Sequence, residues 1–373
     1  MKKIRKRYIA LFMIVMIGLL VGIIVLDRFN SDRQSKVRKE EDLKKWEQRI
    51  DDIKMDQQRV ARKSVYTKLN ESNKVSMLII GDNMGFQLGR YTIETGWMDR
   101  LRPYLTKMYG SELAVYSRSY YDWDVYKCYY DFMNRDQEKY DLIFLFFGYN
   151  EKDTMSVDEF KYYYEALIRQ IQERCDYPEI ILVLESAMDE YSEYTKVIQK
   201  LGEYYGYPVA DTLAPFQKSS LTLEELTRDL MHPNDKGYRI YFNIISKLID
   251  KGVTEEKSVT TGRPEKLCFK PKYPIGAPRM IPLHEMTQED AYTYSYDTKY
   301  HHVGVAYSGY QNKNGKFTVL VNEDVVKTID CKKKLDVEKA DIVKLNLQGK
   351  NKITIRLDRK FAASTDIKGL ILY

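Results

Sequence analysis

Three polar stretches of this sequence carry side chains that suit acid–base chemistry. They read Gly81-Asp82-Asn83, Gly148-Tyr149-Asn150-Glu151 and Asp229-Leu230-Met231-His232. A carboxylate three residues before a histidine in a loop can hold one imidazole nitrogen and leave the other free as a base. An asparagine amide can donate an N–H to a developing oxyanion. These residue types suit a general base, a carboxylate that orients it and a hydrogen-bond donor to an oxyanion.

Each stretch taken singly also fits a structural role. Pro233 and Asn234 follow His232 and make a good helix start, so His232 could be only part of a helix cap. Gly148-Tyr149-Asn150 could be a plain turn. The presence of all three stretches in one order favours the functional interpretation.

The elements that position these stretches follow from the apolar pattern. Five short apolar runs predict buried strands: Val75–Ile80, Leu113–Tyr116, Leu142–Phe147, Ile180–Leu184 and Val209–Ala210. Four stretches between and after them predict helices: Trp97–Met108, Val157–Arg174, Tyr194–Tyr205 and Lys236–Ile249. This alternation predicts a doubly wound α/β domain over residues 75–252 with a parallel sheet. The first two polar stretches follow strands, so we expect them at the carboxyl edge of the sheet.

On these three stretches the sequence resembles the SGNH (GDSL-type) hydrolase family, over roughly residues 75–250. The stretches are similar, in order, to the family's Gly-Asp-Ser, Gly-x-Asn-Asp and Asp-x-x-His blocks. The resemblance implies a flavodoxin-like three-layer fold and ester hydrolysis or acyl transfer, with no metal or organic cofactor. It implies His232 as base, Asp229 as its orienter and Asn150 in an oxyanion hole. It also gives supporting positions to Gly148, Ser119 and Asp82.

Two positions depart from the family pattern. Asn83 stands where the family has its nucleophilic serine, and Ser119 stands where the family usually has a glycine. A carboxamide cannot be deprotonated by a histidine near pH 7 and forms no acyl-ester intermediate. Three explanations stay open. The domain is a non-catalytic descendant that binds its ligand, Ser119 or Ser117 has become the nucleophile, or His232 activates water or a sugar hydroxyl directly.

Aromatic residues gather after the second predicted strand, where Tyr120 to Tyr126 mixes tyrosine and tryptophan with aspartate. Such a mixture suits a sugar ring, and Tyr120, Trp123 and Tyr149 are the candidate substrate contacts. The alternative is aromatic core packing, which is the commoner role of such residues in a chain with 32 tyrosines.

The N-terminus predicts a membrane anchor. Residues 8–26 form a run of 19 residues without a charge, behind a basic tail at residues 1–7. That length spans a bilayer as a helix, and the positive-inside rule places the tail in the cytoplasm and the bulk of the chain outside. Residues 27–74 are highly charged and predict a helical stalk, which could form a short coiled coil. The alternative is a monomeric amphipathic helix that lies on the next domain.

Composition excludes some functions. The net charge is +6, and subtracting the five basic residues of the tail leaves +1, so nothing indicates nucleic-acid binding. The four cysteines form no CxxC pair, so no zinc site is indicated. Four free thiols are expected, with a Cys268–Cys331 disulfide as the alternative.

The C-terminal third changes pattern. Residues 253–290 are rich in proline and predict an irregular linker. Period-two alternation around residues 317–321, 343–347 and 353–357 then predicts a β-sandwich over residues 291–373. We therefore expect a membrane-anchored, extracytoplasmic protein that acts on, or only binds, acylated cell-envelope glycans. A membrane acyltransferase is a possible partner, and the glycan is not identified by the sequence.

Overall fold

A computed structural model describes residues 63–372 of the protein with short gaps. The gaps are residues 93, 136–137, 189–191, 259–263, 265, 271–277, 301, 312–313, 334–335, 344–349 and 361, with the side chain of residue 364. The predicted tail and anchor, and the stalk up to residue 62, lie outside the described residues. Among the described residues, no helix has the length and apolar character needed to cross a membrane.

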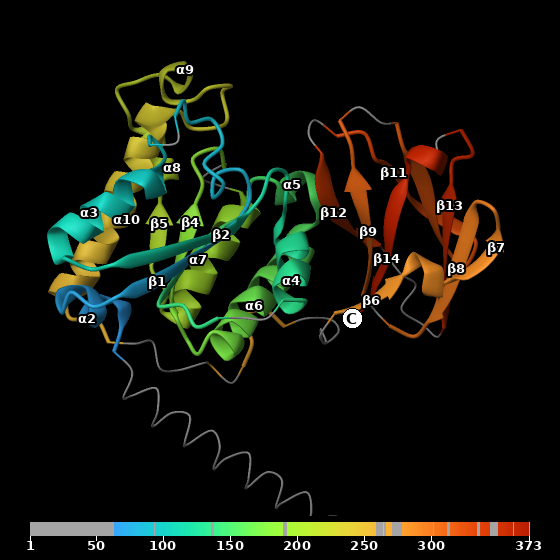
Figure 1. The fold of residues 1–373 in the computed structure, drawn as a ribbon, viewed down its shortest axis with the longest axis horizontal. Helices are drawn as coiled ribbons and strands as arrows, with labels where there is room; N and C mark the ends of the chain where they lie inside the picture. Colours follow the sequence, from blue (N-terminus) through green and yellow to red (C-terminus); the bar gives the residue numbers. More distant parts are fainter. Residues whose placement is uncertain are drawn as a thin grey trace, which may run out of the picture. The chain divides into compact units, whose positions relative to one another are not determined.

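Five parallel strands form the central sheet, in the order β2-β1-β3-β4-β5 (Figure 1). Their bounds are Val75–Gly81 (β1), Leu113–Ser119 (β2), Leu142–Phe146 (β3), Glu179–Leu184 (β4) and Val209–Asp211 (β5). Every residue of β3 and β4 is buried, because helices cover both faces of the sheet. The predicted parallel α/β sheet is therefore confirmed, and its order is that of flavodoxin-like folds.

Helices make the outer two layers. One face carries α2 (Val65–Asn70), α3 (Trp97–Tyr109) and α10 (Asp235–Thr254), and the other carries α4 (Val125–Met133), α6 (Val157–Arg174) and α7 (Glu193–Tyr205). The short helices α5 (Glu151–Thr154), α8 (Leu213–Gln217) and α9 (Leu223–Leu226) lie in the connections. The last helix runs five residues past the predicted end at Ile249.

Two helices correct the expectations. The stalk prediction included residues 65–70, but α2 buries Val65, Tyr66 and Leu69 against the core of the α/β domain. Three apolar residues among charged ones are too few to predict from the sequence that this helix packs on the α/β domain. Helix α4 was not predicted, because its start overlaps the stretch Tyr120 to Tyr126 that we considered for ligand contact. Asp124 caps it by accepting from the Lys127 N–H at 2.9 Å, and most of its residues are buried.

Two antiparallel sheets form the C-terminal part, in the orders β11-β10-β13-β8-β7 and β12-β9-β14-β6. Their bounds are Arg279–Pro282 (β6), Thr287–Asp290 (β7), Thr293–Thr298 (β8), Val303–Gly309 (β9), Lys316–Val321 (β10), Asp324–Asp330 (β11), Val337–Val343 (β12), Asn351–Leu357 (β13) and Asp366–Leu372 (β14). One apolar core takes residues from both sheets, among them Val305, Phe317 and Ile353. The antiparallel sheets predicted from the period-two pattern are confirmed, and they pack face to face as a sandwich.

The predicted linker is only partly irregular. Strand β6 pairs with β14, and Ile281 and Met286 are buried in the sandwich core. These elements are four residues long or shorter and follow several prolines, so their period could not be recognised. The strand predicted around residues 343–347 ends at Val343 in β12, and residues 344–349 lie outside the described part.

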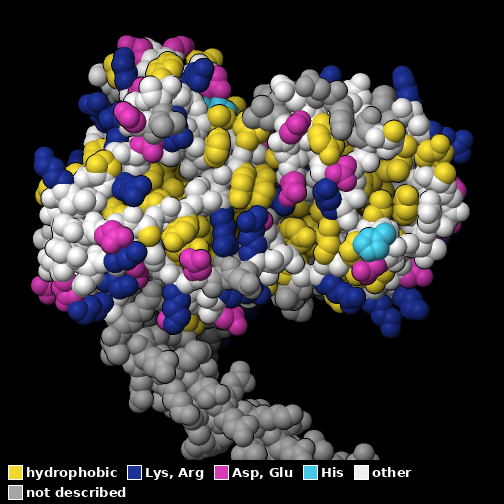
Figure 2. All heavy atoms as spheres, in the orientation of Figure 1, with side chains coloured by type: hydrophobic (Ala, Val, Ile, Leu, Met, Phe, Trp, Pro, Cys, Tyr) yellow, Lys and Arg dark blue, Asp and Glu magenta, His cyan; other side chains and the backbone are white. Residues whose placement is uncertain are grey.

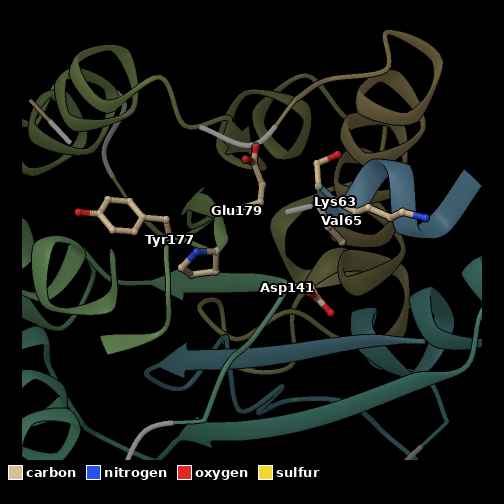
Figure 3. Close-up of a pocket in the computed structure, with 7 residues that line it drawn as sticks. Lys63, Val65, Asp141, Tyr177 and Glu179 are labelled. Atoms are coloured by element: carbon tan, nitrogen blue, oxygen red, sulfur yellow. The ribbon is translucent and has the colours of Figure 1, made fainter. Parts of the chain in front are cut away.

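The edge of the sheet at the amino ends of the strands is closed by ionic contacts. The Lys68 ammonium bonds Asp141 at 2.7 Å, and the Tyr66 hydroxyl donates to Glu179 at 3.0 Å. Between them lies a cavity of about 10 Å³, room for about one water molecule. Figure 3 shows Asp141 and Glu179 on the strand side of this cavity and Lys63 and Val65 on the side of α2. Nothing of the predicted chemistry lies here, so this edge fixes the fold.

The distribution of surface charge and the state of the cysteines agree with what the composition predicts. In Figure 2, basic and acidic side chains are interspersed over the face shown, with apolar side chains between them. All four cysteines are free thiols, so the alternative disulfide between Cys268 and Cys331 does not form.

The best test of the core is Trp97 on α3. Its side chain is fully buried and its ring lies 5.1 Å from the rings of both Phe144 and Phe146 in β3. Trp97→Ala is expected to lower the free energy of unfolding by about 3–5 kcal/mol. Urea denaturation followed by circular dichroism measures the change. Met108→Ala on the same helix, where the side chain is 56% exposed, is the matched control and should change it by about 0.5 kcal/mol or less.

Candidate active site

The turn after β1 is built to display one side chain. Asp82 is fully buried, and its Oδ1 accepts from the Met84 N–H at 3.0 Å, which bends the chain around residue 83. Gly81 permits the close approach to β3, since a Cβ there would lie 2.5 Å from the Phe146 carbonyl oxygen. The next residue, Asn83, therefore stands at the carboxyl edge of the sheet, between β1 and β3. In this strand order that is the switch point where ligands bind.

Asn83, His232 and Asp229 form a hydrogen-bonded row. The Asn83 Nδ2 lies 3.0 Å from His232 Nε2, and His232 Nδ1 lies 2.7 Å from Asp229 Oδ2. The Asn83 Oδ1 accepts from the Asp122 backbone N–H at 2.7 Å, so the amide nitrogen must be the atom that faces the imidazole. Nε2 is then an acceptor, and Nδ1 carries the proton that is donated to Asp229. The sequence placed all three side chains at one site, and the structure brings them together.

Asp229 is fixed in its ionised form. Its Oδ1 accepts from the backbone N–H groups of Met231 at 3.2 Å and His232 at 2.7 Å. Burial acts to raise the pKa of Asp229, but the hydrogen bonds from the His232 backbone and ring outweigh it and hold the pKa below its usual value. Leu230 between them has a φ of +66°, which closes the loop tightly. The helix cap proposed as an alternative role belongs to Asn234, whose Oδ1 accepts from Lys236 and Gly237.

The predicted oxyanion donors are largely engaged. Asn150 Nδ2 donates to the Trp123 carbonyl oxygen at 2.8 Å, which fixes the amide and leaves its second hydrogen for a ligand. The Gly148 N–H donates to the Glu151 carboxyl at 2.6 Å, so it does not serve an oxyanion. The supporting role expected of Gly148 is therefore wrong, because a buried carboxyl takes its only donor.

The serines near the site do not replace the missing nucleophile in this geometry. Ser119 is buried, and its Oγ has no hydrogen-bond partner among the described residues and lies against Gly85. Ser117 is exposed on β2, and its Oγ accepts from the Ser119 N–H at 3.3 Å. The two His232 ring nitrogens bond Asn83 and Asp229 rather than a serine.

Residues 80–240 match the sequence model of the GDSL-like lipase/acylhydrolase family. This segment is a GDSL-like domain. No protein of curated function matches the chain by sequence.

Solved structures resemble the chain in fold. A two-domain esterase active on acetylated mannans superposes with a TM-score of 0.62 at 14% identity, over 82% of this chain and 93% of that one. A structure of a two-domain esterase active on acetylated mannans, co-crystallised with mannopentaose, superposes with a TM-score of 0.63 at 14% identity, over 82% of this chain and 92% of that one. An acetyl xylan esterase from Geobacillus stearothermophilus gives 0.41 at 18% identity, over 47% of this chain and 94% of that one. The first of these shows that the whole two-domain fold occurs in another protein.

The aromatic stretch of the GDSL-like domain divides between core and site. Trp123 is 4% exposed, its ring lies 4.0 Å from that of Tyr120, and the Lys127 ammonium covers it at 4.4 Å. Trp123 is thus a core residue at the start of α4, and its prediction as a ligand contact is wrong in this conformation. Tyr120 is half-buried beside it. Tyr149 remains a candidate, because it borders a cavity.

A cavity of about 480 Å³ lies beside the His232 loop of the GDSL-like domain. The residues that line it combine apolar and polar side chains: Tyr149, Lys152, Ser186, Ala187, Met188, Phe216, Gln217, Leu221, Leu223, Leu226, Leu230 and Met231. A second cavity of about 190 Å³ shares Tyr149, Lys152, Ala187 and Met188 with it. We call these two neighbouring cavities together the groove on the β4 side of the site, and the larger one has the size of an ordinary small-ligand site.

Three buried carboxyl groups beneath the site were not all predicted. Glu185 follows β4 as Asp82 follows β1, and the two carboxyl groups meet. Among the described residues, no donor forms a hydrogen bond with the buried oxygens Asp82 Oδ2 and Glu185 Oε1. Burial raises the pKa of both, which indicates a shared proton. Burial, with Asp124 and Asp82 nearby, raises the pKa of Glu151 to about 8. The sequence feature that could have identified Glu185 is its position directly after a predicted strand, as for Asp82.

Proposed function

We propose that this protein binds acylated glycans at the GDSL-like site and does not turn them over through an acyl-enzyme. The observation that carries the proposal is the Asn83 amide held between the Asp122 N–H and His232 Nε2, at 2.7 Å and 3.0 Å. The amide nitrogen has no available lone pair for attack, since its electrons are delocalised into the carbonyl. It also donates to the lone pair that the base would use. A base in this arrangement has no proton to remove.

The groove beside His232 supports a carbohydrate ligand. It offers Tyr149, whose ring centroid lies 3.9 Å from the Lys152 ammonium, together with the amide of Gln217 and the hydroxyls of Ser186 and Ser192. Such a combination matches a sugar, which presents an apolar ring face and several hydroxyls. The esterase with the similar two-domain fold acts on acetylated mannans. An acetylated polysaccharide is therefore the ligand class that we propose for this chain.

The proposed setting is the outer face of the cell membrane. Residues 8–26 would anchor the chain, with residues 1–7 in the cytoplasm and the GDSL-like domain outside. In that position the protein would meet envelope glycans and a membrane acyltransferase that adds acyl groups to them.

A second candidate function is hydrolysis by a water molecule that His232 activates directly. It is favoured by the 2.7 Å bond between Asp229 and His232 and by the lowered pKa of Asp229, which keep the base oriented. Water could reach Nε2 only after the Asn83 amide moves away. The retained dyad supports this candidate, and the position of the amide weighs against it.

Calorimetry with the full-length protein tests the proposal. Acetylated mannan oligosaccharides are expected to bind, and the same oligosaccharides after chemical deacetylation should bind at least about tenfold more weakly, as expected when a buried site loses its partner group. Tyr149→Ala should weaken binding by a similar factor, while Tyr300→Ala, at a 41% exposed tyrosine of the sandwich, should not.

Acetate release is measured in the same samples. None above the uncatalysed rate is expected from the native protein. Release that disappears in His232→Ala would instead establish the second candidate. Absence of both binding and release would reject both candidates.

A further inference from the structure

A buried lysine of the sandwich reaches the loop beside the candidate site. Lys339 on β12 is 5% exposed, although lysine is almost never buried without a partner. Its ammonium donates to the Asp122 backbone carbonyl and lies 3.1 Å from the Asp122 carboxylate. Asp124 and Asp341 are the other carboxylates that face it. This one cation therefore neutralises charges from both the loop and its own strand.

The loop at residues 120–124 touches both asparagines of the site. The Asp122 N–H donates to Asn83 Oδ1 at 2.7 Å, and the Trp123 carbonyl accepts from Asn150 Nδ2 at 2.8 Å. Asp122 has a φ of +60°, an uncommon conformation for a residue other than glycine. A strained residue keeps such a conformation only where its surroundings hold it. Lys339 supplies two of those contacts.

The sandwich meets the α/β domain through a packed interface. Ala306, Ala340 and Ile371 belong to the same apolar core as α4 and α6. A Cβ at Gly304 would overlap the Tyr126 hydroxyl, so β9 and α4 are in close contact. This packing holds β12 beside α4 together with Lys339, which is therefore one of several contacts between the two parts.

We infer that the sandwich is a structural part of the candidate site, and that Lys339 is a positioning residue for Asn83. The row runs from the Lys339 ammonium to Asp122, from the Asp122 N–H to the Asn83 oxygen, and from the Asn83 nitrogen to His232. Without Lys339, the loop loses its counter-ion, and the Asp122 N–H no longer holds the Asn83 oxygen in place. The inference holds whether the site binds, hydrolyses or does neither, so it does not rest on the proposed function.

Nuclear magnetic resonance of the ligand-free, full-length protein with ¹⁵N-asparagine tests it. The Asn83 side-chain amide pair is identified as the pair that disappears in Asn83→Ser. In Lys339→Met, which keeps most of the apolar side chain, the pair is expected to shift toward the position of a free amide. Its exchange with water should become about fivefold faster or more, which corresponds to the loss of one neutral hydrogen bond. Lys339→Arg should largely restore the native chemical shift and the native exchange rate of the Asn83 amide pair.

Lys327→Met is the matched control, because this sandwich lysine lies 3.4 Å from Asp341 but bonds the Ile342 carbonyl instead of the loop. It should leave the Asn83 amide unchanged. Asp122→Asn keeps the backbone N–H and the φ of the loop but weakens the ionic contact, and it should give the same shifts in smaller size. This variant decides the matter if Lys339→Met does not fold.

Two results would overturn the inference. One is a lower melting temperature in Lys339→Met with an unchanged Asn83 amide, since Lys339 would then only dock the sandwich. The other is an equal change in Lys327→Met, which would show a general loosening of the sandwich.

Discussion

Asn83→Ser is expected to raise ester hydrolysis by about 100-fold or more over the native protein. A serine at this position replaces the amide that now meets His232 Nε2 by a hydroxyl. Its oxygen takes the place of the Asn83 Cγ, one bond farther from Nε2, so the imidazole must shift toward it to form the hydrogen bond. The imidazole is already held by Asp229 in the tautomer that accepts a proton at Nε2. One substitution thus completes the nucleophile, base and orienter of an acyl-transfer site.

The size of the gain follows from what the site still lacks. A complete triad contributes roughly 10⁶ in rate, and the loss of one oxyanion donor removes about 10²–10³. Gly148 gives its N–H to Glu151, and Ser119 adds a side chain where the family usually has a glycine. The gain should therefore be partial, and Ser119→Gly added to Asn83→Ser should raise the rate again.

Hydrolysis of p-nitrophenyl acetate at pH 8 measures the effect. Asn83→Ala is the matched control, because it removes the same amide without supplying a hydroxyl. Asn83→Ser combined with His232→Ala should return to the native rate. An Asn83→Ser variant that folds and binds but stays at the native rate would show that the oxyanion hole, and not the nucleophile, is the missing part.

The stability of the protein is expected to fall as the pH rises from about 5.5 to 8.5. Asp82, Glu151 and Glu185 are fully buried, and burial raises the pKa of each, to about 6 for Asp82 and about 8 for Glu151. The unfolded chain has ordinary carboxyl pKa values of about 4. Between these limits the folded state binds more protons than the unfolded state. Raising the pH therefore favours unfolding.

The direction is opposite to that of surface carboxylates paired with lysine. The stabilising proton is fully present below the unfolded pKa and is lost as the pH passes the folded pKa of each group. The expected loss is about 4 kcal/mol between the two pH values, since Asp82 and Glu151 together contribute about three pKa units and each unit corresponds to 1.36 kcal/mol. The melting temperature should fall by about 5–10 °C.

Thermal unfolding at pH 5.5 and 8.5 checks the prediction. Glu185→Gln should reduce the difference, because its amide can donate to Asp82 Oδ2 at both pH values. Glu224→Gln, at an exposed glutamate of α9, is the matched control and should leave the difference unchanged. A native melting temperature that is equal at both pH values would show that the carboxyl groups ionise without cost.

Several features of this protein were predictable because they depend on neighbours in the chain. The strands β3 and β4 are continuous apolar runs, which is the signature of a sheet buried on both faces. Asp229 and His232 are three residues apart, so their 2.7 Å contact is local. The turn that displays Asn83 needs only the end of β1 and the Asp82 side chain. These elements also carry the family resemblance.

Other predictions failed because one sequence feature serves two structures. A stretch of tyrosine, tryptophan and aspartate suits a sugar site and a buried helix start equally well, and Trp123 is in the core. The short strand β6 has no period that four residues could reveal, and its partner β14 lies far along the chain. The α2 helix is recognisable only by what it packs against.

The sequence by itself determined the parallel sheet, the order of the polar stretches, the Asp229–His232 pair and the absence of a serine at position 83. Only the tertiary structure decided what that absence does. The Asp122 N–H orients the Asn83 amide toward His232, and Lys339, more than 200 residues away in the chain, holds Asp122. The Asp82–Glu185 pair likewise joins two strands that are separated by β3. Such contacts depend on which strands and domains lie side by side after folding, and a local sequence pattern does not determine those neighbours.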